Sequence, residues 1–528
     1  GVNTADENNV YIGGVPLLKT DDGGKTFTSI GKENVHADHQ AIWVNPNHKG
    51  HVINGNDGGV NITYDDGENW TKNNSPSVGQ YYYVNVDNKK PYNVYGGFQD
   101  NGVWVGPSTY KASMYWHNSG HYPYKGLLGG DGMQVAVDTR DNNLVYTGFQ
   151  FGYYYRINQE TGERKFIKPQ HELGERPLRF NWQSPIHLSS HNQDILYFGA
   201  NKVFRSMNKG VDLEPISEDL TKGGRKGDVP FGTLSTVQES HMKFGLVYVG
   251  SDDGWIHVTK DGGNNWERIS DDLPQDLWVS RVEPSRHDEA TIYTSLNGYR
   301  WDDFNSYIYR STDYGKNWTK IGTDLPAEPV NVIREDPKNS NVLYVGTDHG
   351  LYISLDKGES FMAMNNNLPA VAIHDLIVHP RDNDLVVGTH GRSIYIGNVE
   401  HLQQMSAGMM ANAVHVFELD KIKYNNRWGY LRNAWSKPYV PSTTIPFYTN
   451  QAGKATITVE TEDGLLVQEM EVDAVKGLNY IDYDLTIEQL FKKYPKGFDE
   501  ANKLAFKAGD DGKTYIEKGK YTGTVKLG

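Results

Sequence analysis

One short pattern recurs nine times along this chain: a β-rich segment ending in Gly, then a polar turn, then a second β-rich segment. VYGGFQDNG at 94–102 and VYVGSDDG at 247–254 are examples. Several short strands in each period of about 40 to 50 residues are typical of β-propeller blades. A chain of 528 residues is also too long for one ordinary hydrophobic core, which favours several domains or a repeat array. The copies align, 42 to 51 residues apart, on Gly13, Gly55, Gly97, Gly148, Gly199, Gly250, Ser295, Gly346 and Gly388.

One period shows how such a blade forms. LWVSRVEPS (277–285) predicts the inner strand and ATIYTSL (290–296) the second. SYIYRST (306–312) predicts the third strand and NWTKIG (317–322) the outer one. Each period therefore predicts one four-stranded antiparallel sheet.

A second pattern, Ser/Thr-x-Asp-x-Gly-x-x-aromatic, falls on the turn between the third and outer strands. TDDGGKTF (20–27) and STDYGKNW (311–318) are two of five full copies, and SMNKGVDL (206–213) is a worn one. The Asp can accept hydrogen bonds from turn amides, the Gly adopts angles that a β-carbon forbids, and the ring packs between sheets. We therefore expect structural rather than catalytic roles for Asp22, Asp65, Asp261, Asp313 and Asp356.

These boxes resemble the Asp-box, or BNR, repeat of sialidases, sortilin-type receptors and tandem-propeller xyloglucanases. A closer likeness covers about residues 36–397. The stretches HADHQAIWVNPNHKGHVINGNDGG, GGDGMQVAVD, FNWQSPIHLS and GTHGRSIYI are similar to a widespread bacterial family of secreted sortilin-like BNR proteins, often labelled glycosyl hydrolase. The resemblance implies a propeller in a secreted or cell-surface protein, and the label alone is no evidence of hydrolysis.

The predicted fold class is all-β, in four parts. Residues 79–400 contain seven copies of the repeat and predict a complete seven-bladed propeller, preceded in 1–78 by the last blades of another. A single ring of about ten blades, as in sortilin-type receptors, is the alternative. Residues 401–450 predict a short helix and a Pro-containing linker or strap. Residues 451–528 alternate like strands and predict an immunoglobulin-like β-sandwich with one helix inserted from Thr486.

Composition excludes several classes of function. The net charge of -14, with no basic tract, disfavours nucleic acid, because duplex binding depends on Lys and Arg. No apolar run approaches the roughly 20 residues of a transmembrane helix. The absence of Cys excludes disulfides, a thiol nucleophile and thiolate metal ligands. Gly1 leads directly into strand-like sequence, so we expect any targeting peptide to have been removed or to lie outside this chain.

In a propeller, the turns between second and third strands and the beginnings of the first strands surround one mouth of the central channel, away from the boxes. The insert NGYRWDDFNS (297–306) is the most distinctive of these turns. Aromatic rings at the mouth can stack on sugars or anchor peptide side chains. The predicted ligand-binding residues are Gln99, Asp100, Trp182, Trp255, Arg281, Tyr299, Arg300, Trp301, His349, His390 and Arg392.

The sequence contains candidate residues for two kinds of glycosidase chemistry. Inverting hydrolysis needs one protonated and one ionised carboxyl about 6.5 to 9.5 Å apart. Asp57, in GNDGG, resembles the Asp after a second strand in tandem-propeller xyloglucanases, and Asp131 or Asp348 could be its partner. An Asp before Gly is also a common turn residue. Sialidase chemistry would require three Arg, for which Arg281, Arg300 and Arg392 are available, but the Arg-Ile-Pro signature is absent.

A metal site is not expected, and neither is a cofactor. His36, Asp38 and His39 are suitable ligand types. On an extended strand, however, His36 and Asp38 share one face while His39 points to the other. We expect these side chains to form a hydrogen-bonded cluster instead.

The preferred hypothesis is a secreted or cell-surface propeller that binds a protein, peptide or glycan at the channel mouth. An outer-membrane or secretion-linked complex is its candidate assembly, since the Asn, Lys and Tyr richness and the terminal sandwich resemble secreted proteins of Bacteroidota. The alternative is an inverting endo-glycoside hydrolase of the xyloglucanase kind. A purely structural assembly subunit is a third possibility.

Overall fold

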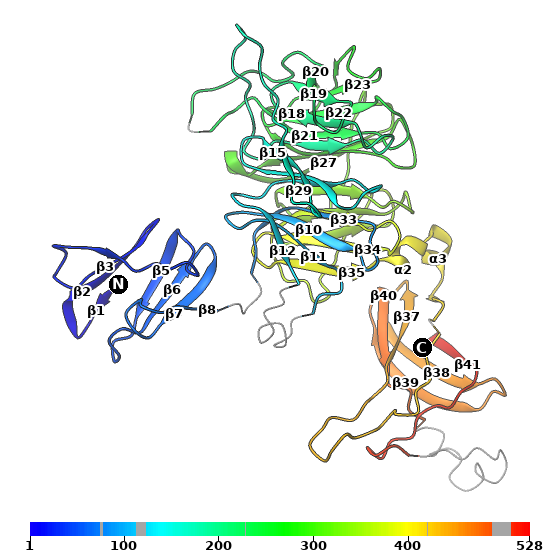
Figure 1. Cartoon of the computed structure of the whole chain (residues 1–528). Helices are drawn as coiled ribbons and strands as arrows, with labels where there is room; N and C mark the ends of the chain where they lie inside the picture. The colour runs from blue at the N-terminus through cyan, green and yellow to red at the C-terminus, as the bar shows by residue number, and fades with distance from the viewer. Residues whose placement is uncertain (74–77, 112–122, 228, 420, 488–507) are drawn as a thin grey trace. The chain divides into compact units, whose positions relative to one another are not determined.

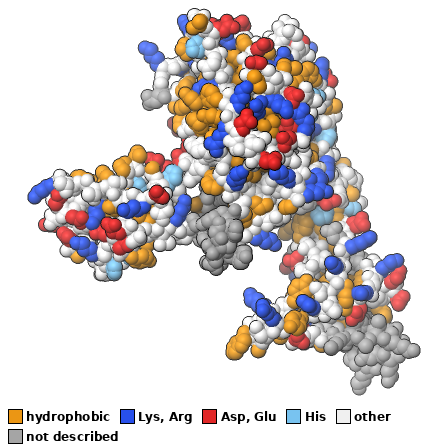
Figure 2. Space-filling model, in the orientation of Figure 1, with side chains coloured by type: hydrophobic (Ala, Val, Ile, Leu, Met, Phe, Trp, Pro, Cys, Tyr) orange, Lys and Arg blue, Asp and Glu red, His pale blue; other side chains and the backbone are white. Residues whose placement is uncertain are grey.

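A computed structural model describes the chain except for residues 74–77, 112–122, 228, 420 and 488–507 (Figure 1). It separates into two compact units, Gly1–Gln403 and Gln404–Gly528. Both are built almost wholly of antiparallel strands, so the all-β prediction is confirmed. The face shown in Figure 2 carries acidic and basic side chains interspersed. No helix within the described ranges has the length and apolar character needed to cross a membrane.

The first unit begins with two four-stranded sheets. One contains β1 (Val2–Asn3), β2 (Asp6–Gly13), β3 (Leu17–Thr20) and β4 (Thr28–Ser29). The other contains β5 (His39–Val44), β6 (Val52–Asn56), β7 (Gly59–Thr63) and β8 (Thr71–Asn73). They share one apolar core, formed by Tyr11, Leu17, Ile30, Val52 and Trp70.

Seven sheets follow one another in the described part of residues 78–403. The first is β9 (Tyr81–Val86), β10 (Asn93–Phe98), β11 (Gly102–Pro107) and β12 (Lys125–Leu128), and the second is β13 (Val135–Val137), β14 (Leu144–Phe149), β15 (Tyr153–Asn158) and β16 (Arg164–Phe166). The third is β17 (Ile186–Leu188), β18 (Leu196–Gly199), β19 (Val203–Ser206) and β20 (Glu214–Pro215), and the fourth is β21 (Leu234–Glu239), β22 (Val247–Ser251), β23 (Ile256–Thr259) and β24 (Glu267–Arg268). The fifth is β25 (Trp278–Pro284), β26 (Ile292–Gly298), β27 (Asp303–Ser311) and β28 (Thr319–Lys320). The sixth is β29 (Val330–Glu335), β30 (Leu343–Thr347), β31 (Leu351–Ser354) and β32 (Met362–Ala363), and the seventh has only β33 (Ile373–Val378), β34 (Asp384–Thr389) and β35 (Ile394–Asn398).

The repeated Gly positions explain why these sheets pack so closely. All nine aligned positions lie on the second strand of their sheets. A β-carbon on Gly250 would come within 2.4 Å of Val279 Cγ1, on the first strand of the next sheet. A β-carbon on Gly388, in the seventh sheet, would come within 2.6 Å of Val84 Cγ1, in the first. The last sheet therefore meets the first through the same kind of close approach that joins consecutive sheets.

Further contacts join the two ends of this series. Strands β33 and β34 pack against β9. Gln80 and His390 form an antiparallel bridge, and the Gly391 amide donates to the Gly79 carbonyl at 2.9 Å. The tandem sheets thus form a propeller.

The Asp boxes hold their own turns and also link neighbouring sheets. Asp313 accepts hydrogen bonds from the Asn317 amide at 2.9 Å and the Ser311 hydroxyl at 2.7 Å. The Asn317 side chain is the largest cause of a pKa of about 2 for Asp313. Trp318 Nε1, at the end of the box, donates at 2.6 Å to the carbonyl of Ile269 beside the preceding sheet. The Asp313 carboxylate is therefore ionised and already hydrogen-bonded within its own turn, which fits a structural role.

The second unit has two three-stranded sheets around a shared core. Short helices α2 (Glu400–Gln404) and α3 (Ala407–Ala411) precede its strands, where the sequence predicts one short helix. One sheet has the order β36 (Val414–Val416), β37 (Thr443–Thr449), β40 (Gly477–Tyr483), and the other β39 (Leu466–Ala474), β38 (Gly453–Thr461), β41 (Tyr521–Leu527). Phe447, from the predicted strap, is fully buried with Ile457 between them, so parts of the strap are strands. The helix predicted from Thr486 lies outside the described residues beyond Ile487.

A candidate ligand-binding cavity at the channel mouth

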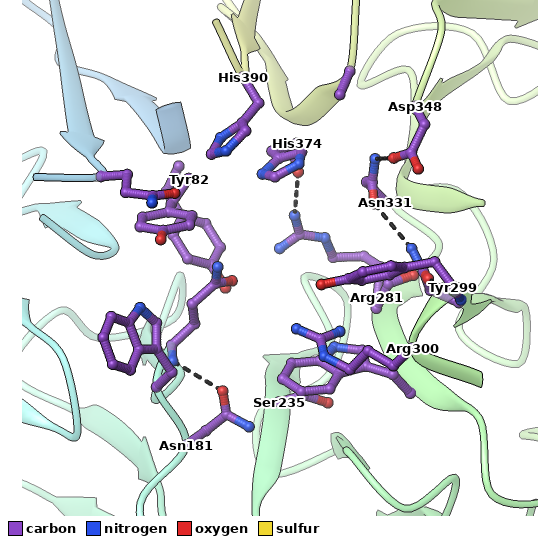
Figure 3. Close-up of a pocket in the computed structure, with 18 of the residues that line it drawn as sticks. Tyr82, Asn181, Ser235, Arg281, Tyr299, Arg300, Asn331, Asp348, His374 and His390 are labelled. Atoms are coloured by element: carbon purple, nitrogen blue, oxygen red, sulfur yellow. Dashed lines mark hydrogen bonds between the residues drawn. The ribbon is translucent and has the colours of Figure 1, made fainter. Parts of the chain in front are cut away.

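A cavity of about 640 Å³ opens where first strands and second-to-third-strand turns of the propeller converge (Figure 3). Eight residues predicted from the sequence line it, namely Gln99, Trp182, Arg281, Tyr299, Arg300, Asp348, His349 and His390. Lining residues absent from those predicted sets include Tyr82, Asn181, Ser235, Trp278, Asn331 and His374. Six predicted residues do not line it: Asp57, Asp100, Asp131, Trp255, Trp301 and Arg392.

Buried ion pairs connect Arg281, which lines the cavity, to charged residues outside the lining. Arg281 Nη2 lies 3.0 Å from Asp375 Oδ1, and both side chains are 4% exposed. Arg334 shares the same carboxylate oxygen at 3.2 Å and pairs with Glu283 at 2.7 Å. Two cations and two carboxylates compensate one another here, which buried charges require.

Two stacked imidazoles form one wall. The rings of His374 and His390 lie 4.2 Å apart, tilted by 13°, and the Tyr82 ring is 5.8 Å from His390. Burial lowers the pKa of His374 to about 3, with the neighbouring His390 as the next cause. Burial also lowers the pKa of His390. Both rings are therefore neutral near pH 7 and present aromatic faces rather than charge.

The opposite wall holds a guanidinium between rings. Arg300 Cζ lies 4.1 Å from the centre of the Trp278 ring and 4.7 Å from that of Tyr299. Tyr299 and Trp301 bracket Arg300 in a single 3-10 turn, η1 (Tyr299–Trp301), between β26 and β27. Cation–π contacts of this kind orient the guanidinium without occupying its N–H groups.

Side-chain amides fill much of the remaining surface. Asn331 Nδ2 donates to Asp348 Oδ1 at 2.9 Å, and Asn297 Nδ2 donates to Asn331 Oδ1 at 3.0 Å. Among the described residues, Asp348 supplies the one carboxylate of the lining. The cavity can therefore offer many neutral donors and acceptors to a polar ligand.

The other predicted carboxylates interact with one another instead. The Asp100 amide donates to Asp131 Oδ1 at 2.8 Å. Burial first, and then the charges of Asp131 and Asp57, raise the pKa of Asp100 to about 6. Asp57 and Asp131 thus both lie near Asp100, whereas Asp348 lines the cavity.

The remaining predicted residues have other surroundings. Trp255 packs against the Arg268 guanidinium at 4.8 Å, and Arg392 lines a separate cavity with Tyr395. Trp301 is 51% exposed beside the mouth. His39 Nδ1 shares a 2.7 Å hydrogen bond with Asn54 Oδ1, whereas His36 Nε2 lies 3.0 Å from the Asp100 carbonyl oxygen.

Comparison with known proteins confirms the resemblance to sortilin-like repeats in one segment. A family model described as sortilin, neurotensin receptor 3 (Sortilin-Vps10), matches residues 306–411. A xyloglucanase from Hypocrea jecorina (strain QM6a) is 31% identical over 134 residues, 23% of this chain and 15% of the relative. A xyloglucanase from a Paenibacillus species is 25% identical over 179 residues, 31% of this chain and 17% of the relative. The chain therefore spans less than a fifth of the length of these curated relatives.

Two solved structures are similar at lower identity. The xyloglucanase from Xanthomonas campestris has a TM-score of 0.46 at 14% identity and covers 76% of this chain and 67% of its own. YCF48 from Cyanidioschyzon merolae has a TM-score of 0.44 at 9% identity, covering 61% of this chain and 95% of its own.

Proposed function

We propose that this protein binds a glycan in the cavity at the channel mouth and does not hydrolyse it there. The proposal rests on the lining of this cavity. Its described residues combine aromatic rings and side-chain amides with a single carboxylate. Flat rings such as Trp182 and Tyr299 can stack on sugar faces, and Asn and Gln amides can exchange hydrogen bonds with hydroxyls. Inverting or retaining hydrolysis generally needs two carboxyl groups, and among the described residues of the lining Asp348 has no second one beside it.

The scaffold proposed for this site is a closed ring. We propose that residues 79–400 are a seven-bladed propeller, that 1–78 are terminal blades of another, and that 451–528 are an immunoglobulin-like sandwich after a linker at 401–450. The approach of Gly388 to Val84 supports closure of the ring. An extracellular or cell-surface location, where glycans are available, fits this function.

A glycan array with purified full-length protein tests the proposal. We expect signal for a defined class of oligosaccharide, reduced at least tenfold by Trp182→Ala and by Tyr299→Ala. Trp435→Ala is the matched control, because Trp435 is 94% exposed in the second unit. Binding that survives both cavity substitutions, or no glycan binding at all, would refute this function.

Hydrolysis at Asp57, Asp100 and Asp131 is a second candidate. The observation that favours it is the pKa of about 6 for Asp100, since a carboxyl group that is protonated near neutral pH can act as a general acid. The distant similarity to xyloglucanases points to β-glucans as substrates to test. Release of reducing ends from xyloglucan, lost in Asp100→Asn and Asp131→Asn but retained in Asp348→Asn, would support this candidate. No release by the wild-type protein would remove it.

A further inference from the structure

Arg300 brings to the cavity a positive charge that forms no ion pair within the part of the chain that the structure describes. Its guanidinium rests on Trp278 and Tyr299, and no carboxylate of the described residues forms an ion pair with it. Burial within the cavity lowers the pKa of Arg300, and this effect outweighs the opposing charge of Asp252, with which Arg300 forms no ion pair. The Arg300 guanidinium nevertheless stays charged, because the ordinary pKa of an arginine side chain is far above neutral pH.

The other charges around the cavity are matched. The charge of Arg281 is compensated by Asp375, which lies outside the lining. Asp348 is held by the Asn331 amide, and its charge acts on His390. His374, by contrast, is influenced by the charges of Arg281 and Arg300. The cavity is therefore polarised. The negative charge of Asp348 acts on the imidazole wall, and the positive charge of Arg300, which has no ion-pair partner among the described residues, lies on the wall of Trp278 and Tyr299.

The orientation of Arg300 suits recognition of a planar acid. Stacking of the guanidinium on two rings fixes its plane and leaves its N–H edges for hydrogen bonding. Such a fork binds a carboxylate or sulfate through two parallel, charge-assisted hydrogen bonds. Ser235 and Asn297, which also line the cavity, supply neutral groups for adjacent hydroxyls.

We propose that the glycan bound in this cavity carries an acid group, a uronic carboxylate or a sulfate ester, and that Arg300 binds that group. The inference rests on the proposed glycan-binding function and specifies its ligand class. Acidic glycans gain the charge-assisted contact, whereas a neutral glycan leaves the Arg300 charge unpaired in a partly desolvated site.

Calorimetric titration of the full chain with matched oligosaccharides tests this inference. One pair is tetragalacturonate and its fully methyl-esterified form, and the other is a sulfated galactan tetrasaccharide and its desulfated form. At least one acidic form should bind about ten- to a hundredfold more tightly than its neutral match. The pair that shows the difference distinguishes carboxylate from sulfate, and the preference should weaken as salt is raised.

Three variants assign the effect to the side chain. Arg300→Gln should abolish the preference for the acidic form, and Arg300→Lys should reduce it because the planar fork is lost. Arg310→Gln removes the same charge from a residue that pairs at the surface with Glu359, and should leave the preference unchanged. Equal binding of acidic and neutral forms by the wild-type protein would overturn the inference while glycan binding stands. Failure of every oligosaccharide to bind would overturn both.

Discussion

Arg281 and Asp375 form an ion pair across the channel of the propeller, 3.0 Å apart and almost wholly buried. The two residues lie on β25 and β33, and Arg334 on β29 joins them through the same carboxylate. Asp375 also accepts the Val84 amide of β9 at 3.2 Å. One carboxylate thus connects strands from four sheets and holds Arg281, which lines the cavity.

Loss of Asp375 should therefore destabilise the protein strongly. Asp375→Ala leaves Arg281 and Arg334 without this shared carboxylate, and we expect the free energy of unfolding to fall by about 3 to 5 kcal/mol. Denaturant titration measures this change. Glu359→Ala, which breaks the exposed pair with Arg310, is the control and should cost less than about 1 kcal/mol. Similar small effects in both variants would contradict the central role of Asp375.

Closure of the ring makes a prediction about two glycines. Gly388→Ala places a β-carbon within 2.6 Å of Val84, so one of the two sheets must shift, at a cost of about 1 to 3 kcal/mol. Gly397→Ala, one strand further on, meets nothing within 4 Å and should be neutral or slightly stabilising. Comparison of the two melting temperatures tests the contact. An open series of sheets would tolerate both substitutions equally.

The box Trp318 should contribute through its indole nitrogen as well as its ring. Trp318→Phe keeps an aromatic ring but leaves the Ile269 carbonyl without its 2.6 Å partner. We expect a loss of about 1 to 3 kcal/mol in the free energy of unfolding. Trp301→Phe, at an exposed position, should change it by less than about 0.5 kcal/mol. A negligible change for Trp318→Phe would show that the hydrogen bond between sheets has no net value.

The stacked imidazoles predict a loss of stability in acid. Burial holds the pKa of His374 near 3, below its unfolded value of about 6.5, so the unfolded state binds more protons between these values. The contribution of His374 to stability is therefore lost as pH falls from about 6.5 towards 3. His390, Arg281 and Arg300 surround this imidazole and oppose its charging.

His374→Phe keeps an aromatic ring at the position that stacks on His390, but removes the imidazole that binds a proton in acid. The fall in melting temperature between pH 7.5 and pH 4.5 should be smaller in this variant than in the wild type. His349→Phe, whose side chain is 69% exposed, is the control and should keep the wild-type fall. An identical fall in all three proteins would mean that His374 is not held neutral.

The sequence predicts the repeat and the boxes well because both depend on local chemistry. Gly250 and Gly388 mark second strands, and the residues around Asp313 specify their own turn. The mouth is predicted less completely. In the run YYYVNV, Tyr81, Tyr82 and Tyr83 are all buried, so alternation does not tell which ring borders the cavity.

The sequence does not predict which charged residues of the site pair with one another, because these contacts join residues that are far apart along the chain. Arg281 lines the cavity, and its charge is also matched by Asp375, 94 residues away, which no local pattern reveals. Likewise Asp348 and Asp131 were equivalent partners for Asp57 in the sequence. The structure separates them, because Asp348 is bound by Asn331 in the cavity while Asp131 accepts from Asp100.

The most direct test of the glycan site is fluorine NMR on protein labelled with 5-fluorotryptophan, which reports on all 12 Trp at once. Titration with the oligosaccharide that binds best should shift the signals of Trp182 and Trp278, which line the cavity, and leave Trp318 and Trp435 unchanged. Shifts confined to Trp435 or Trp318, with Trp182 and Trp278 unmoved, would contradict a glycan site at the channel mouth.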